Sequence, residues 1–375
     1  MAPKPLIAMK NIFLILAIVS LQLSIHAQKK GRAAIDSLIQ VLQNDPNDTT
    51  RVRTTNLISF ELKVLGKVDS ALELASSSLA LAKKINFIRG EADAYFFIGQ
   101  AFAGKGKSTD ALINYLAAQK LYEQLKRTAD LAETYYAIGS VHQRSNYDEA
   151  LNFFYKGFRT AQLTSNKDLM GKIAYIIAVV LIRKSEQGEA AKYKDLAIKY
   201  YTEAGNETGL ANCYVVSARL NNYSGNVQQS VKDNYSALKL FEKTGNKVGM
   251  YNVHIGLGLM HEDQKNWKEA LNSYLAAKKA AEGVPAKEVL AGAYNNVGNA
   301  YRELGNTDEA YKAFSEALKL SEQVGDKKGI ATSQGNLGTI YHLMGRHDDA
   351  LKSFEEARKR FEEIGSKEST SISYL

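Results

Sequence analysis

The sequence predicts an all-α fold, a right-handed superhelical α-solenoid of eight helix pairs, and three observations support that prediction. Residues 293–321 and 333–361 match closely at an offset of 40. A small residue recurs at fixed spacing along most of the chain, and only four prolines occur in 375 residues. Repeats of this length indicate stacked supersecondary units. The matched positions are Asn296/Asn336, Gly298/Gly338, Tyr301/Tyr341, Gly305/Gly345, Asp308/Asp348, Ala310/Ala350, Phe314/Phe354, Glu316/Glu356, Ala317/Ala357 and Gly325/Gly365.

The two helices of each unit can be followed through their smallest residues, which leave room for a large side chain on a neighbouring helix. Consecutive members lie 40 residues apart, except for an interval of 39 between Gly139 and Ala178 in the first helices and between Ala111 and Ala150 in the second helices. They define eight repeats of about 40 residues over 51–365. In the first helices the small positions are Ser59, Gly99, Gly139, Ala178, Ala218, Gly258, Gly298 and Gly338. In the second helices they are Ala71, Ala111, Ala150, Ala190, Ser230, Ala270, Ala310 and Ala350.

Turn signals separate the helices. Gly305-Asn306 interrupts the pattern inside one unit, and Asn306 with Glu309 three residues on predicts an N-cap of the capping-box type. The same signature begins at Asn146, Asn226 and Asn266. Glycines are expected to close second helices in the left-handed conformation, at Gly205, Gly245, Gly325 and Gly365.

The order small, aromatic, small, aromatic is carried by Gly298, Tyr301, Ala310 and Phe314. This order closely resembles the tetratricopeptide repeat (TPR), in a forty-residue form with lengthened helices. HEAT and armadillo units have similar lengths, but this spacing of glycine and alanine argues against them. The resemblance implies a curved stack whose concave face is lined by the first helix of each pair.

The N-terminus differs from the rest. Residues 1–11 carry Lys4 and Lys10 and no acid, residues 12–25 are mainly apolar, and His26-Ala27 precedes a basic stretch. This order predicts a secretory signal peptide over 1–27, with Met9 as an alternative initiator. An uncleaved membrane anchor is the other interpretation, although fourteen residues are short for a span. No cysteine lies near the cleavage point, which argues against a lipoprotein anchor.

Two further segments flank the repeats. Residues 28–50 are expected to contain a capping helix over 33–44 that covers the apolar face of the first repeat, because an end unit has no neighbour there. Residues 366–375 align with 326–335. They therefore form either a short C-terminal cap or the start of a ninth first helix in a longer chain.

Charge gives no sign of nucleic-acid binding. The net charge of +8 falls to +6 when residues 1–27, with their two lysines, are removed. Basic and acidic residues alternate without long blocks of one sign, so we expect no nucleic-acid partner. The single Cys213 excludes an intramolecular disulfide. Its apolar helical surroundings predict a buried, unreactive thiol.

No motif indicates catalysis. The chain lacks the phosphate-binding glycine loops, the HExxH motif and the GxSxG elbow. His142 and His261 occupy the repeat position that holds Tyr301, which favours packing over metal binding. His254 lies seven residues before His261 on the same helix, without further ligand spacing. We therefore expect no enzyme activity, no metal and no cofactor.

The TPR resemblance implies that a ligand peptide lies along the concave face, held by residues flanking the small position of each first helix. Asn295, Asn299 and Arg302 are then suited to a peptide backbone and an acidic group. The lysine–asparagine clamp that some members use for a C-terminal carboxylate is not matched, because no repeat carries its first lysine. The expected groove residues are Phe96, Gln100, Tyr136, Ser140, Tyr175, Val179, Ile182, Val215, Arg219, Tyr223, Asn252, Ile255, Leu259, Asn295, Asn299 and Arg302.

The segment 173–182 is apolar on every face. Either burial between neighbouring helices or an apolar patch facing the groove accounts for it.

These observations predict a non-enzymatic scaffold that binds protein or peptide and is exported, either periplasmic or membrane-tethered and facing the periplasm. The signal peptide, the DSLIQVLQ run, residues 48–52 and the forty-residue repeats also resemble exported TPR regions of bacterial sensor histidine kinases or transcription regulators. The alternative is therefore the sensory part of a signalling protein that continues beyond Leu375. Membrane contact would then come from an uncleaved signal or a later span. The partner and the oligomeric state remain open.

Overall fold

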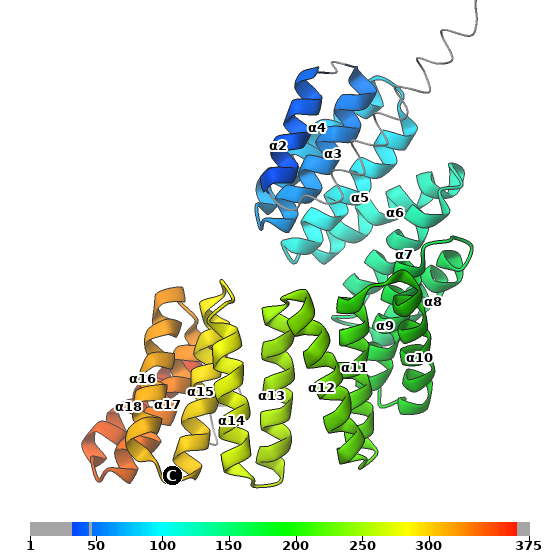
Figure 1. The fold of residues 1–375 in the computed structure, drawn as a ribbon. Coiled ribbons are helices and arrows are strands. Elements are labelled where there is room, and N and C mark those ends of the chain that lie inside the picture. Colours follow the sequence, from blue (N-terminus) through cyan, green and yellow to red (C-terminus); the bar gives the residue numbers. More distant parts are fainter. Residues whose placement is uncertain (1–31, 45–46, 366–375) are drawn as a thin grey trace, which may run out of the picture. The chain divides into compact units, whose positions relative to one another are not determined.

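The computed structural model describes residues 32–44 and 47–365, and these residues form 17 helices and no strand (Figure 1). They divide into two compact units, residues 1–186 and 187–375. We call these unit 1 and unit 2 and describe each separately. The expected signal peptide at 1–27 and the segment 366–375 lie outside the described residues.

Unit 1 is a stack of antiparallel helices in which consecutive helices pack on one another. The first helices of neighbouring pairs also touch directly, α3 with α5 and α5 with α7. One face of the unit is thus built from first helices alone. The helices are α2 (Arg32–Asn44), α3 (Asp48–Val64), α4 (Val68–Lys84), α5 (Ile88–Gly104), α6 (Ser108–Gln124), α7 (Thr128–His142), α8 (Tyr147–Ala161) and α9 (Lys167–Arg183).

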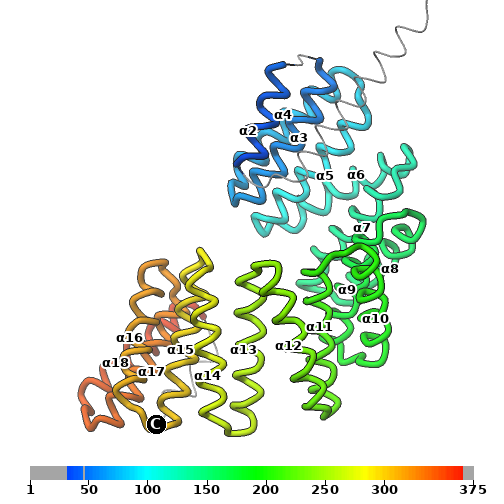
Figure 2. Tube along the Cα trace, viewed as in Figure 1, coloured from blue at the N-terminus to red at the C-terminus, as the bar shows by residue number. Residues whose placement is uncertain are grey.

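Unit 2 repeats the same arrangement, and the trace in Figure 2 runs back and forth through consecutive helices. Here the first helices α15 and α17 touch directly. The predicted all-α array of paired helices is confirmed. The helices are α10 (Gln187–Ala204), α11 (Glu207–Tyr223), α12 (Val227–Thr244), α13 (Lys247–Asp263), α14 (Trp267–Ala281), α15 (Lys287–Glu303), α16 (Thr307–Val324), α17 (Lys327–Leu343) and α18 (His347–Glu363).

The segment expected to cap the repeats contains α2, which packs on α3 and buries Ala34 and Leu38. The first repeat begins earlier than the predicted residue 51. Asn47 is the N-cap of α3, and its side chain accepts a hydrogen bond from the Thr49 backbone N–H at 2.9 Å. Because this cap satisfies a free N–H group of the first turn, the helix starts at Asp48.

Where the small position of a first helix is a glycine, it lies against an aromatic ring of the second helix. A Cβ atom placed on Gly298 would lie 2.7 Å from the Phe314 ring, and one placed on Gly99 would lie 2.7 Å from the Tyr115 ring. No carbon atom fits at that distance. These positions therefore require glycine because the ring fills the space where a side chain would begin.

The predicted caps are partly confirmed. Gly205, Gly245, Gly325 and Gly365 all have positive φ, as expected. Asn146 caps α8 by accepting from the backbone N–H groups of Asp148 and Glu149. Asn226 accepts from Gln229 at 3.4 Å, a long contact.

The cap prediction was wrong for Asn266 and Asn306, whose side chains make no capping hydrogen bond. Their ψ values of 68° and 70° are close to the 66° of Asn226, whose capping contact is long, whereas ψ at Asn146 is 102°. Unpredicted caps occur instead on first helices. Asn166, Asn206 and Asn246 have ψ of 87° to 89° and accept from the backbone three residues on.

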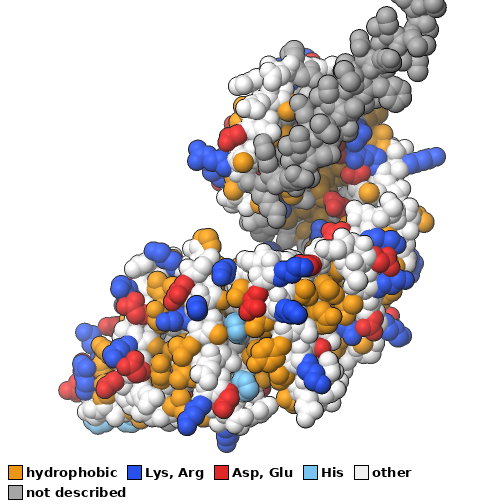
Figure 3. Space-filling view, in the orientation of Figure 1, with side chains coloured by type: hydrophobic (Ala, Val, Ile, Leu, Met, Phe, Trp, Pro, Cys, Tyr) orange, Lys and Arg blue, Asp and Glu red, His pale blue; other side chains and the backbone are white. Residues whose placement is uncertain are grey.

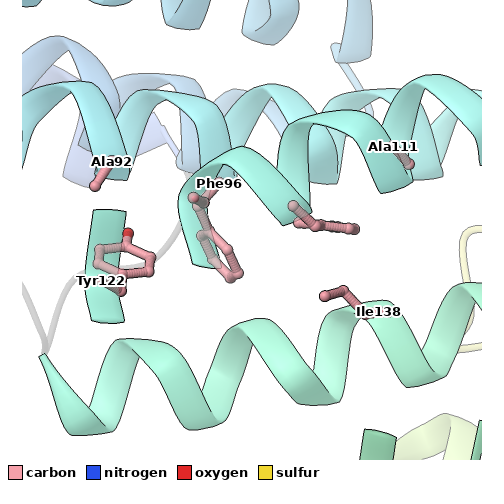
Figure 4. Close-up of a cluster of buried hydrophobic side chains, with 7 residues drawn as sticks. Ala92, Phe96, Ala111, Tyr122 and Ile138 are labelled. Atoms are coloured by element: carbon pink, nitrogen blue, oxygen red, sulfur yellow. The ribbon is translucent and has the colours of Figure 1, made fainter. Parts of the chain in front are cut away.

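The interior of unit 1 mixes small and aromatic side chains. Phe96, Tyr122 and Ile138, from α5, α6 and α7, point into the same interior space (Figure 4). The rings of Phe96 and Tyr115 lie 5.7 Å apart, and each is less than 10% exposed. Phe96 is therefore both a core residue and part of the wall described next.

Candidate functional site

A pocket of about 520 Å³ opens on the face of unit 1 that is built from first helices. Four of the predicted groove residues, Phe96, Gln100, Tyr136 and Ser140, line it together. A second pocket of about 390 Å³ shares Phe96 and Gln100 with the first, as well as Phe60 and Glu133. We call the two adjoining pockets the unit 1 groove.

The repeat itself places the groove side chains. Residues three, four and seven apart on a helix share a face. The same three positions of α3, α5 and α7 therefore point into the groove at each repeat. These sets, each spaced by 40 residues, are Arg53/Asp93/Glu133, Asn56/Phe96/Tyr136 and Phe60/Gln100/Ser140. Because the chain is one residue shorter in the third repeat, the first set continues at Lys172 on α9, which also lines the groove.

Two lysines lie on the wall of the larger pocket. Lys63 Nζ donates to Gln100 Oε1 at 3.4 Å, and Lys172 Nζ lies 4.2 Å from the centroid of the Tyr136 ring. Burial lowers the pKa of Lys63, and the positive charge of Lys172 lowers it further. The two ammonium groups thus act on each other within one pocket.

The acidic side chains of the groove fall into two kinds. Asp93 and Asp130 both pair with Arg127, at 3.3 Å and 2.6 Å, and Asp93 also accepts from the Tyr122 hydroxyl at 2.8 Å. Burial raises the pKa of Asp93, and Arg127 opposes that rise. Burial also raises the pKa of Glu133, and Lys172 opposes it. The Asp93 end is therefore neutralised internally, whereas Glu133 interacts mainly with Lys172.

Asn56 provides a buried acceptor at the smaller pocket. Its side chain is 2% exposed, and Nδ2 donates to the Gly90 carbonyl at 3.2 Å. Oδ1 is buried and has no hydrogen-bond partner among the described residues. A buried acceptor without a partner is costly, so a donor is missing at this point of the groove.

The sequence prediction missed Asn56, Phe60, Lys63, Glu133 and Lys172. The signal was present, because Asn56 and Phe60 are the first-repeat equivalents of Phe96 and Gln100. The predicted groove began only at the second repeat. The prediction considered only residues close to the small position of each first helix. Lys63 and Lys172 lie further from the small positions Ser59 and Ala178, so it did not include them.

The predicted residues on α9 do not line the described pockets. Tyr175 and Val179 are partly exposed, and Ile182 is 6% exposed. Most of the apolar segment 173–182 is buried, including Ile173, Ile177 and Leu181. Burial, the first of the two interpretations, therefore accounts for its composition.

In unit 2 several predicted residues are engaged within the protein. Asn295 exchanges hydrogen bonds with the Ser333 hydroxyl at 3.1 Å and 3.2 Å and accepts from Asn336 at 3.3 Å. Arg302 pairs with Glu303 at 2.9 Å, and Arg219 donates to the Tyr223 hydroxyl at 3.2 Å. The Asn295 amide thus joins α15 to α17 instead of facing a ligand with free hydrogen-bonding groups.

The remaining predicted residues of unit 2 differ in exposure. Asn252, Leu259 and Tyr223 are exposed, whereas Val215, Ile255 and Asn299 are partly buried. Over α11–α18, the face seen in Figure 3 shows hydrophobic side chains in separate patches between charged ones. A ligand role for these residues stays a prediction.

The residues considered for other chemistry have structural surroundings. His142 stacks on Phe153 with ring centroids 5.6 Å apart. Cys213 is buried, and burial raises its pKa to about 12. Among residues 32–44 and 47–365, no three His, Cys, Asp or Glu side chains are grouped as a metal site would need. No helix in that part of the chain is long and apolar enough to span a membrane.

Comparison with known proteins agrees with this architecture. Residues 289–363 match the family model of the tetratricopeptide repeat. The match covers this part of the chain alone, and the other described residues show the same TPR-like pairing of antiparallel helices. No curated protein sequence gives a significant match to the chain.

Two solved structures illustrate the likeness. The apo form of RapI is 15% identical, with a TM-score of 0.63 and alignment over 94% of this chain and 98% of RapI. The apo quorum sensor NprR from B. thuringiensis is 14% identical, with a TM-score of 0.63 over 88% of this chain and 92% of NprR.

A third structure, of a Rap protein complexed with competence and sporulation factor, is 13% identical. Its TM-score is 0.53 over 86% of this chain and 95% of that protein. Identities this low show a shared fold and carry no conclusion about ligand.

Proposed function

We propose that the protein is a non-enzymatic scaffold that binds a peptide or an extended protein segment in the unit 1 groove. The observation that carries this proposal is the alignment of nine equivalent side chains from α3, α5 and α7 along two adjoining pockets. An elongated groove with aromatic walls and polar groups at regular intervals suits an extended chain. One protein of similar fold was solved in complex with a factor, which supports a binding role for such a scaffold.

Selection of a random dodecapeptide library on the full chain tests the proposal. The best peptide, labelled with a fluorophore, is then titrated with wild type, Gln100→Ala and Tyr136→Ala, and binding is followed by fluorescence anisotropy. We expect each variant to weaken binding by about tenfold or more, as central groove residues do. Tyr235→Ala is the control, because Tyr235 is 58% exposed on α12 of unit 2.

Peptide binding that is unchanged in both groove variants would overturn the assignment. Tyr175→Ala and Arg302→Ala extend the experiment to predicted positions outside the pockets. A loss of affinity in either would add that position to the binding surface.

We further propose that the chain is exported and that residues 1–27 direct export. The basic start, the apolar run and His26-Ala27 support this proposal. N-terminal sequencing of the mature protein from the host should begin at Gln28. Recovery of the protein with Met1 or Met9 at its N-terminus would exclude cleavage after Ala27. An apolar span encoded beyond Leu375 would favour the alternative, a sensory region of a two-component signalling protein.

A further inference from the structure

Two half-buried cations in the unit 1 groove have no carboxylate at ion-pair distance among the described residues. Lys63 and Lys172 line the same pocket. Within the described residues, neither forms an ion pair. The groups in direct contact with them are neutral: Gln100 and the Phe60 ring for Lys63, and the Tyr136 ring for Lys172. Glu133 acts on Lys172 only at longer range. Since each charge disfavours the other, an anion placed between them would be stabilised by both.

The groove as a whole is also positively charged. Three carboxylates line it, and two of them, Asp93 and Asp130, are already paired with Arg127. The cationic side chains outnumber the three carboxylates two to one, which favours a negatively charged ligand. The groove cations are Arg53, Lys63, Arg89, Arg127, Arg144 and Lys172.

The rest of the wall limits what kind of anion fits. Phe60 and Phe96 line both pockets, so an apolar group must cover them if binding is to exclude water. The buried Oδ1 of Asn56 has no donor among the described residues, and a backbone N–H could supply one. A small inorganic anion supplies neither, whereas a peptide supplies a carboxylate, an apolar side chain and backbone N–H groups together.

We propose that the unit 1 groove selects an extended acidic peptide. An aspartate or glutamate side chain lies between Lys63 and Lys172, a neighbouring apolar side chain covers Phe60 and Phe96, and a backbone N–H donates to Asn56. This inference rests on the proposed function and specifies its ligand class.

The peptides selected on the full chain provide the first test, because they should be enriched in an acidic residue adjacent to an apolar one. The best peptide is then titrated with the double variant Lys63→Gln/Lys172→Gln and with Glu133→Gln. We expect the double variant to bind at least about tenfold more weakly, and Glu133→Gln to bind more tightly, because it removes a competing negative charge. Replacing the acidic residue of the peptide by its amide should abolish both effects.

The control is Lys84→Gln/Lys120→Gln, which removes the same charge from exposed positions of unit 1 that do not line the groove. It should bind nearly as wild type. Thermal unfolding of every variant checks that the fold is retained.

The outcomes separate the two proposals. If no peptide binds the chain, the proposed function fails. If peptides bind and respond to Gln100→Ala but show no acidic preference and no response to the lysine variant, only the present inference fails. Inorganic phosphate at about 1 mM, the Kd of a weak site, should leave most of the peptide bound. Complete displacement would identify the lysines as a simple anion site and overturn the peptide assignment.

Discussion

The seven helix pairs that lie within a single unit pack in two ways. In five pairs a glycine of the first helix faces an aromatic ring of the second, as Gly258 faces Tyr274 and Gly298 faces Phe314. In the first and fifth pairs, Ser59 and Ala218 take the glycine position, and Ala75 and Asn234 take the place of the ring. There the contacts are smaller or polar. Across the first pair the Ser59 hydroxyl donates to the Ala71 carbonyl at 2.7 Å, and across the fifth pair Asn221 Nδ2 donates to the Asp233 carboxylate at 2.8 Å.

The comparison shows that the glycines and the rings are one structural feature. A glycine inside a helix costs about 0.5–1 kcal/mol relative to alanine, so it persists only where something else needs the space. The aromatic ring occupies this space, since a Cβ at Gly258 would lie 2.3 Å from the Tyr274 ring. In the pairs without an aromatic ring, the equivalent position of the first helix carries serine or alanine.

The largest effect should come from removing a ring. Phe314→Ala empties a site whose side chain is 0% exposed, next to a glycine that cannot fill the space. We expect a loss of about 3–5 kcal/mol in the stability of α15 and α16, as for buried phenylalanines in general. Hydrogen exchange of these helices, with urea unfolding of the whole chain, measures it. An effect below about 1 kcal/mol would show that the ring is not what holds the pair together.

The forty-residue period predicted the helix pairs well because the same packing problem recurs in each repeat. Once Gly298 and Ala310 mark one pair, equivalent residues mark the others. The period could not predict features that depend on backbone detail. Asn306 is at the predicted N-cap but makes no capping hydrogen bond, whereas Asn146, with a ψ of 102° instead of 70°, makes two.

The groove was only partly predictable for a related reason. Phe96, Gln100 and Tyr136 lie on the predicted face because helical spacing places them there. The net charge of the groove could not be predicted from the repeat positions. Lys63 and Lys172 belong to different repeats and line one pocket only when four repeats are stacked. Asn295 fits the expected pattern, yet Ser333, 38 residues later, occupies its amide.

A smaller effect is expected from adding one carbon beside a ring. Gly258→Ala gains about 1 kcal/mol from helix propensity but forces its Cβ into the Tyr274 ring, an overpacking that costs about 1–3 kcal/mol. Because Tyr274 is 1% exposed and its hydroxyl is hydrogen-bonded to Glu262 at 2.5 Å, the ring has little freedom to move. We expect a net loss of up to about 2 kcal/mol. Thermal unfolding at a fixed scan rate reports its sign. A gain in stability would show that the ring shifts freely and that the glycine is not required.

The smallest effect, with the opposite sign, is expected two residues earlier on the same helix. Gly256 lies within α13 with ordinary helical backbone angles, and no atom beyond its own stretch of helix lies within 4 Å of the place its Cβ would take. Gly256→Ala therefore keeps the gain in helix propensity and avoids the clash, so stability should rise by about 0.5–1 kcal/mol. Both variants add one methyl group to one helix, so a difference in sign isolates the ring contact from the backbone effect. Equal losses in the two variants would mean that α13 tolerates no added side chain at either position, and the pairing of glycine with ring would lose its explanatory value.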